Sequence, residues 1–229
     1  MNIRLITLLC LAGSAAAVAD SSPQVALYYS FDSPPPPAVF AQIQTELGRI
    51  LDATDLQVKW REMGASSYEE PGAIYVMRFH GSCRAPMLGS LKGLGSLGPD
   101  ERSLAETSVS DGKVLPFADV WCNRVQKYLG VRVGGDVAMG RALARVAAHE
   151  LFHMMSSSTA HAGNGIACAE YSREDLTARR FLFGRGETEW LRTWAGSRNA
   201  IRPTPVPSAT LASAALLPAG SDDHSDTER

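Results

Sequence analysis

Alternating and continuous apolar stretches predict three strands and a helix in the first part of the chain. Val25–Phe31 is rich in aromatic and β-favouring residues and ends before the prolines at 34–37, which cannot continue a strand. Leu56–Arg61 and Ala73–Phe79 show comparable strand patterns. Between the first two strands, Val39–Ile50 has apolar residues at three- and four-residue spacing, which predicts an amphipathic helix. The expected order is strand, helix, strand, strand.

A hairpin and further helices are predicted after these strands. Asp111-Gly112 favours a tight turn between two short strands, Thr107–Val109 and Val114–Phe117. Asp119–Leu129 has a helical pattern. The longest predicted helix begins with Asp136 as N-cap and continues to Met155.

The C-terminal part combines helical and low-complexity sequence. A second helix is expected from Ser172, with a break at 184–186 before it continues to Trp194. From residue 197 onward proline, alanine, serine and threonine dominate, and the last residues are polar and mostly acidic. Such a composition does not bury enough apolar surface to fold, so we predict a disordered tail over 197–229.

The N-terminus has the pattern of a secretory signal peptide. A basic start is followed by a short apolar run and then by Ala17-Val18-Ala19, a small-x-small cleavage site. The apolar run, at about 15 residues, is shorter than a membrane span requires. We therefore predict a signal peptide over 1–19, a folded domain over 20–196, and a secreted or periplasmic location.

Composition and charge limit the classes of partner. The chain has 229 residues, of which 45% are hydrophobic, enough for one sizeable core. Its formal net charge of -2 provides no basic field that would attract nucleic acid or an anionic membrane. We therefore expect neither as a partner. The sequence leaves the oligomeric state open.

Three cysteines remain once the leader that contains Cys10 has been removed. Export would place them in an oxidising compartment, where an odd number leaves at least one unpaired. Cys83 and Cys122 each follow a predicted strand, so a common sheet could bring them within disulfide reach. We predict a Cys83–Cys122 disulfide and a free Cys168.

The sequence His149-Glu-Leu-Phe-His153 lies within the longest predicted helix. Histidines four residues apart project from one side of a helix, so both imidazoles can reach the same metal ion. Zinc prefers such nitrogen ligands, and Glu150 is placed to act as the general base for a zinc-activated water. The plainer interpretation is a core helix with two partly buried histidines and a surface glutamate. The predicted helix, the predicted export and a nearby third histidine favour the zinc site.

This stretch resembles the zincin metallopeptidases, which carry His-Glu-x-x-His on a helix packed under a twisted sheet. The resemblance covers roughly residues 136–176 and implies a zinc peptidase-like fold with Glu150 as general base. The chain is also similar to little-characterised secreted bacterial proteins with His-Glu-Leu-aromatic-His, a loop histidine and then Gly-Ile, here His161 and Gly165-Ile166. No substrate is implied.

The third zinc ligand separates the zincin classes, and the chain departs from both standard patterns. Metzincins have His-Glu-x-x-His-x-x-Gly-x-x-His, but here His161 comes two residues late and no methionine follows it. Gluzincins take a glutamate from a later helix, for which Glu170 and Glu174 have a related spacing. We prefer His161, because zinc favours imidazole and the small residues at 156–160 allow the loop to fold back toward the helix.

Local structure offers another explanation for the acidic residues, because Ser172-Arg-Glu-Asp175 matches a helix capping box. Glu170 and Glu174 therefore stay as alternative ligands. Tyr171 is a possible oxyanion donor beside the site, although packing is its more ordinary role.

These expectations define one overall interpretation. The fold is α+β and zincin-like, with a twisted, mostly antiparallel sheet, a backing helix and a long active-site helix. The function is a secreted zinc metallopeptidase that hydrolyses peptide or protein substrates, in which His149, His153 and His161 hold Zn²⁺ and Glu150 is the base. The alternative is a zincin-like zinc-binding or envelope interaction protein without turnover.

Overall fold

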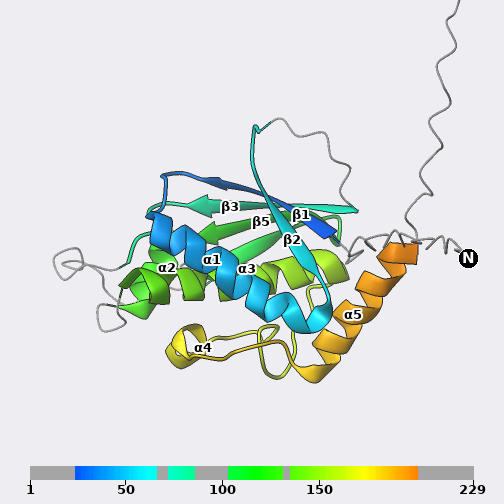
Figure 1. Cartoon of the computed structure of the whole chain (residues 1–229). Helices are drawn as coiled ribbons and strands as arrows, with labels where there is room; N and C mark the ends of the chain where they lie inside the picture. The colour runs from blue at the N-terminus through cyan, green and yellow to red at the C-terminus, as the bar shows by residue number, and fades with distance from the viewer. Residues whose placement is uncertain (1–23, 66–71, 86–102, 131–134, 201–229) are drawn as a thin grey trace, which may run out of the picture.

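A computed structural model of the chain describes residues 24–65, 72–85, 103–130 and 135–200 (Figure 1). The predicted signal peptide and most of the predicted tail lie outside these residues. In chain order the elements are β1 (Gln24–Phe31), α1 (Pro37–Leu51), the 3-10 turn η1 (Asp52–Thr54), β2 (Gln57–Glu62), β3 (Ala73–His80), β4 (Ala105–Ser110), β5 (Lys113–Trp121), α2 (Cys122–Leu129), α3 (Gly135–Ser156), α4 (Arg173–Thr177) and α5 (Arg185–Ala200).

The five strands form one sheet in the order β2-β1-β3-β5-β4. β1 pairs in parallel with β2 and β3, and β3 pairs in parallel with β5. Among the described strands only β4, which a tight turn joins to β5, pairs antiparallel. The prediction of a mostly antiparallel sheet was therefore wrong. Parallel pairing needs a long crossover, which α1 supplies between β1 and β2, and the consecutive strands β2 and β3 flank β1 instead of pairing with each other.

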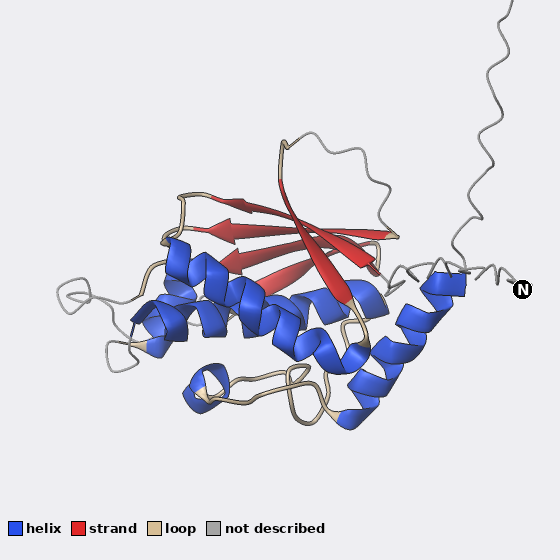
Figure 2. Cartoon of the chain, viewed as in Figure 1, coloured by secondary structure: helices blue, strands red, loops and turns tan. Residues whose placement is uncertain are grey.

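The α+β fold class, the backing helix and the long helix are confirmed. Figure 2 shows the helices gathered on one side of the sheet, where α1 and α3 lie next to each other. At their crossing, a Cβ atom on Gly140 would approach the carbonyl oxygen of Val39 to 2.7 Å. The absence of a side chain therefore allows the two helices to pack closely. One continuous cluster of buried apolar residues joins the inner face of the sheet to these helices.

Two predicted helices differ in their bounds. Asp119–Trp121 belongs to β5, because buried Ala118 and Val120 alternate with more exposed residues at the two-residue period of a strand, and α2 begins only at Cys122. The helix predicted from Ser172 is two helices, α4 and α5, separated by 178–184. The predicted capping box is present, since the Ser172 hydroxyl accepts from the Asp175 backbone N–H and the Asp175 carboxylate accepts from the Ser172 N–H.

The ends of two other elements also differ from prediction. Asp136 lies in the first turn of α3, which starts at Gly135, rather than before it. Helix α5 extends to Ala200 and so passes the domain boundary predicted at residue 196. The low-complexity composition therefore begins inside a helix.

A buried ion pair joins α1 to α3. Arg145 has no exposed surface and Glu46 has 3%. The Arg145 guanidinium donates from Nε at 3.0 Å and from one terminal nitrogen at 2.8 Å to Glu46 Oε1, and it also donates to the carbonyl oxygens of Asp175 and Ala178. These bonds fix the segment around α4 against the two helices.

A disulfide joins Cys83 and Cys122, as predicted, and connects the end of β3 to the start of α2. Cys168 is a free thiol. Within the described part of the chain, no helix has the length and apolar character that crossing a membrane requires.

Candidate metal centre

The His149–His153 motif lies near the C-terminal end of α3, where almost every residue is buried. His149, Glu150 and His153 are only 8%, 6% and 5% exposed. Polar groups buried to this extent need hydrogen-bonding or ionic partners. The hydrogen-bond partners of these three side chains therefore indicate which ligand the site can bind.

Two loop carbonyls orient the helix histidines. His149 Nδ1 lies 2.8 Å from the carbonyl oxygen of Ile166, and His153 Nδ1 lies 2.7 Å from that of Ser158. A carbonyl oxygen only accepts, so each Nδ1 carries the hydrogen and each Nε2 has its lone pair free in the neutral ring. The two Nε2 atoms face each other at 2.9 Å, a distance at which two lone pairs need a shared proton or a cation.

His161 joins this pair from the loop that follows α3. The loop is closed by a hydrogen bond of 2.8 Å from the Ala162 N–H to the Ala167 carbonyl. The ring centroid of His161 lies 5.2 Å from that of His149 and 4.8 Å from that of His153. The candidate ligand nitrogens of all three histidines lie within 4.8 Å of one another. The structure therefore brings the three predicted ligands together.

Gly165 determines the path of this loop. It has a φ of +72°, and a Cβ atom there would approach the carbonyl oxygen of Leu182 to 2.6 Å. The next residue, Ile166, donates its N–H to the same Leu182 carbonyl at 3.0 Å. Because Ile166 also orients His149, the loop contact with the segment before α5 supports the histidine pair.

Burial keeps the helix histidines neutral. Loss of solvation lowers the pKa of His149 to about 4, against the opposing effect of its hydrogen bond to Ile166. Burial lowers the pKa of His153 as well. Both imidazoles therefore have lone pairs available at neutral pH, the form in which histidine binds a metal.

Glu150 lies next to the histidines and contacts the edge strand of the sheet. Its Oε2 accepts a hydrogen bond of 2.6 Å from the hydroxyl of Thr107 on β4. Burial raises the pKa of Glu150 to about 7, opposed by the Thr107 hydroxyl. The carboxylate thus lies in the range suited to exchanging protons near neutral pH.

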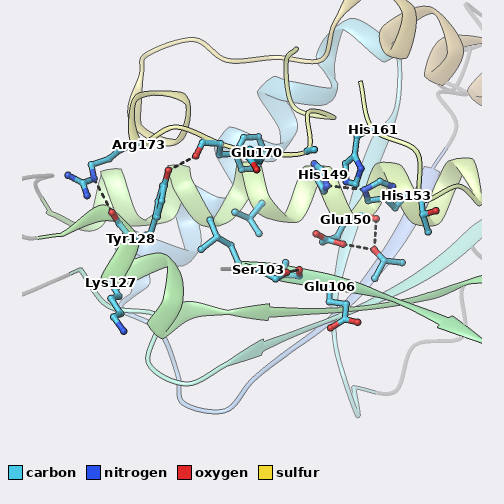
Figure 3. Close-up of a pocket in the computed structure, with 17 residues that line it drawn as sticks. Ser103, Glu106, Lys127, Tyr128, His149, Glu150, His153, His161, Glu170 and Arg173 are labelled. Carbon is cyan, nitrogen blue, oxygen red and sulfur yellow. Dashed lines mark hydrogen bonds between the residues drawn. The ribbon is translucent and has the colours of Figure 1, made fainter. Parts of the chain in front are cut away.

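A pocket of about 860 Å³ opens over these residues (Figure 3). Its walls come from β4 and the residue pair before it, from the end of α2, from α3 and the loop after it, and from the segment that leads into the first residue of α4. In Figure 3, Lys127 and Arg173 lie at the end opposite to the three histidines. The lining residues are Ser103, Leu104, Ala105, Glu106, Thr107, Lys127, Tyr128, Val146, His149, Glu150, His153, Thr159, His161, Ala169, Glu170, Tyr171 and Arg173.

The acidic alternatives to His161 are not part of the histidine group. Glu170 lines the pocket, but in the described part of the chain the only group with metal-ligand spacing consists of the three histidines. Glu174 lies in the first turn of α4, beside the capping residue Asp175. The geometry therefore favours His161 over both glutamates.

Tyr171 lies beside His149, with ring centroids 5.7 Å apart. Its hydroxyl donates to the Ile166 carbonyl, which also accepts from His149, and burial raises the pKa of the phenol well above its usual value. The hydroxyl therefore supports the carbonyl that orients a histidine. Its role as an oxyanion donor stays a prediction.

Three contributors to the site were missed in the sequence. Thr107 had no recognisable signal, because it meets Glu150 only through the pairing of distant elements. The carbonyls of Ser158 and Ile166 are backbone groups, to which residue type gives no direct clue. Gly165 before Ile166 was the one usable signal, since an internal loop glycine often marks a close approach or a positive φ.

Cys168 lies near the pocket without lining it. Its thiol donates to the Glu170 carbonyl at 3.0 Å, and burial raises its pKa. A raised pKa disfavours the thiolate that would bind a metal. The role of Cys168, which the sequence left open, is not assigned by these contacts.

The donor set fits a zinc ion. In a tetrahedral site with Zn–N bonds of 2.0–2.1 Å, two ligand nitrogens are about 3.3 Å apart. The His149 and His153 Nε2 atoms, at 2.9 Å, need to separate by only a few tenths of an ångström to reach this spacing. Three imidazoles beside an open pocket correspond to the ligand number of catalytic zinc sites, which keep a further position for water or substrate.

Comparison with known proteins adds one structural likeness. No protein-family model matches the chain, and no curated protein matches its sequence. Among solved structures, the crystal structure of archaemetzincin from Methanopyrus kandleri aligns with 78% of this chain and 98% of that chain, at 13% identity and a TM-score of 0.46. At this distance the function has to be inferred from the residues of the site.

Proposed function

We propose that the chain is a zinc-dependent metallopeptidase. The observation that carries this proposal is the convergence of three imidazoles and one buried glutamate in a single pocket. His149, His153 and His161 would hold the zinc ion, with the two Nδ1–H groups of the helix histidines bound to loop carbonyls. A structural zinc site would ordinarily have four protein ligands and no need of a base.

Glu150 is the proposed general base. His149, His153 and His161 would hold the zinc ion, which when bound would supply a Lewis acid for hydrolysis of a peptide bond. Glu150 accepts a proton from the attacking water at Oε1, the carboxylate oxygen that Thr107 does not occupy, and delivers it to the leaving amine. Glu150 is only 6% exposed and lines the pocket, so its carboxylate is accessible from the pocket and little from elsewhere.

The shape of the pocket supports a peptide substrate. β4 is an edge strand, and Ala105, Glu106 and Thr107 of this strand line the pocket beside the histidines. The edge of a sheet offers backbone N–H and C=O groups that an extended peptide can pair with. A peptide bound in this way would lie along the pocket with one of its peptide bonds next to Glu150.

We also propose that the protein is exported and acts in a secreted or periplasmic location. The proposal rests on the signal-peptide pattern of residues 1–19 and on the pairing of Cys83 with Cys122, which suits an oxidising compartment. Determination of the N-terminus of the mature protein tests it, and a chain that retains Met1 in an expressing bacterium would contradict it.

The decisive experiment combines zinc analysis with an activity assay on casein, an unstructured protein substrate. Wild-type protein is expected to contain stoichiometric zinc and to cleave casein until a chelator removes the metal. Glu150→Gln should keep zinc and fold but lower turnover by at least about 100-fold, because the base is lost. Glu189→Gln, which changes an exposed glutamate on α5, is the matched control and should keep full activity.

The possible outcomes separate peptidase from binding protein. Zinc binding without turnover in the wild type would support the zinc-binding or envelope interaction protein instead. Full activity of Glu150→Gln would show that this carboxylate is not the base. Absence of zinc from correctly folded protein would contradict the metal site itself.

A further inference from the structure

Thr107 connects the edge strand to the proposed base. It lies on β4 opposite Ala118 of β5, and the register of this pair shifts between Thr107 and Val109. Ala105, two residues earlier, is buried, whereas Val109, two residues later, is 49% exposed. Because of this irregular pairing, Thr107 is the last residue of β4 whose side chain faces the helices, and it lies beside the pocket.

The contact of Thr107 with Glu150 is specific in its geometry. Thr107 Oγ1 lies 2.6 Å from Glu150 Oε2 and 3.4 Å from the Glu150 backbone oxygen. A hydroxyl has one hydrogen to donate, and the shorter distance together with the negative charge directs it to Oε2. The bond spans 43 residues of sequence, so it depends on the packing of β4 against α3.

From this contact we propose that Thr107 is a positioning residue for Glu150. The hydroxyl fixes Oε2 and so leaves Oε1 as the oxygen that exchanges protons with water and with the leaving amine. This inference rests on the proposed peptidase function and assigns a further residue to it. A proton acceptor must lie within hydrogen-bond reach of its donor, so a carboxylate free to rotate would spend less time in the productive orientation.

The proposal predicts an effect on turnover rather than on substrate binding. Thr107→Val preserves the shape of the side chain and removes the donor, whereas Thr107→Ser preserves the donor and removes a methyl group. Loss of a hydrogen bond to a charged group should lower kcat by roughly 10- to 100-fold. Zinc content should not change, because the Thr107 hydroxyl bonds to Glu150 and not to a proposed ligand. KM should not change, because a peptide would pair with the backbone of β4 and not with this hydroxyl. Replacing a threonine with a purely structural role would not lower kcat while leaving KM and zinc content unchanged.

The test uses zinc-loaded, full-length mature protein with casein as substrate. Thr107→Val and Thr107→Ala are measured beside Thr107→Ser, which should recover most of the wild-type kcat. Thr45→Val is the matched control, because its exposed hydroxyl donates to the Ala41 carbonyl on α1 and Thr45 does not line the pocket. Combining Thr107→Val with Glu150→Ala should cause no further loss beyond Glu150→Ala alone, since Thr107 acts only through that carboxylate.

Each outcome decides between the two proposals. Wild-type kcat in both Thr107→Val and Thr107→Ala, beside an active wild type, would overturn the positioning role alone. Loss of kcat in Thr107→Ser equal to that in Thr107→Val would also overturn it, because the hydroxyl would then be irrelevant. A zinc-loaded wild type without turnover would instead overturn the peptidase function and the inference together.

Discussion

Two buried polar clusters lie one helical turn apart on α3 and are built differently. Every nitrogen of the Arg145 guanidinium donates to Glu46 or to a carbonyl of α4 or its C-cap, so the charge is fully paired within the chain. Four residues later, His149 has only its Nδ1 paired with a loop carbonyl. Its Nε2 faces the Nε2 of His153 beside a pocket.

Whether all polar atoms of a buried cluster are paired within the chain distinguishes a structural network from a candidate binding site, and this criterion does not depend on a sequence motif. A buried polar group that serves the fold is satisfied by its own chain, since an unpaired one is costly. At the histidines, two groups that both accept are held face to face by hydrogen bonds on their far sides. A cation between the two acceptors would stabilise such an arrangement, so the second cluster could hold a metal ion.

The largest expected effect is the loss of zinc from His161→Ala. Two helix histidines alone form a weak and open site, so zinc affinity should fall by several orders of magnitude. Measurement of bound zinc after identical dialysis of variant and wild type tests this. His80→Ala is the control, because His80 pairs with Asp119 and Asp32 outside the pocket. Retention of stoichiometric zinc by His161→Ala would remove the histidine from the ligand set.

The Arg145 cluster should respond in stability and not in metal binding. Arg145→Met removes one of the two arginines that donate to the buried Glu46 carboxylate, the other being Arg49. It also leaves the carbonyls of Asp175 and Ala178 without this donor, so the free energy of unfolding should fall by about 1–3 kcal/mol. Arg185→Met is a control, because its pair with Glu189 has a comparable distance of 2.8 Å but is exposed, and it should cost less than about 1 kcal/mol. Denaturant unfolding gives both values. Equal costs would contradict the distinction between buried and exposed pairs.

The sequence predicted the part of the site that lies on one element. His149, Glu150 and His153 are close because of helix geometry alone, and the apolar spacing around them identifies the helix. The disulfide was predictable for a related reason, since Cys83 and Cys122 each follow a strand of the same sheet. His161 was predictable from its nearness in sequence and from the preference of zinc for imidazole.

The parts that depend on pairing between distant segments were not predictable. Parallel and antiparallel strands share the same residue preferences here, so the direction of β2 and β3 relative to β1 could not be read from them. Thr107 meets Glu150 only because the register of β4 on β5 places it there. A helix break was predicted at 184–186, whereas the structure places it at 178–184, where the Ala178 carbonyl accepts from Arg145 of the distant helix α3.

A smaller effect is expected at Gly165, where the fold and the site meet. Gly165→Ala places a Cβ atom 2.6 Å from the Leu182 carbonyl at a φ of +72°, so the loop must shift. The shift moves the Ile166 carbonyl that orients His149, and loss of such a support typically lowers metal affinity by about 10- to 100-fold. Competition with a chromophoric zinc chelator measures this affinity.

Gly163 supplies the matched control within the same loop. A Cβ atom at Gly163 meets no other atom within 4 Å. Gly163→Ala should therefore keep the zinc affinity of the wild type. If both glycine variants bound zinc equally well, the Ile166 carbonyl would have no part in orienting the ligand.

The smallest effects are expected from the two acidic residues that rival His161. Glu170→Ala and Glu174→Ala should retain zinc, because neither glutamate is part of the cluster of side chains that could hold a metal ion. Glu174 lies in the first turn of α4, where a negative charge stabilises the helix start, so its loss should cost about 1 kcal/mol or less. Zinc content after the dialysis used for His161→Ala tests both variants. If either lost its zinc while His161→Ala kept it, the third ligand would be a glutamate, and the loop histidine would belong to the wall of the pocket.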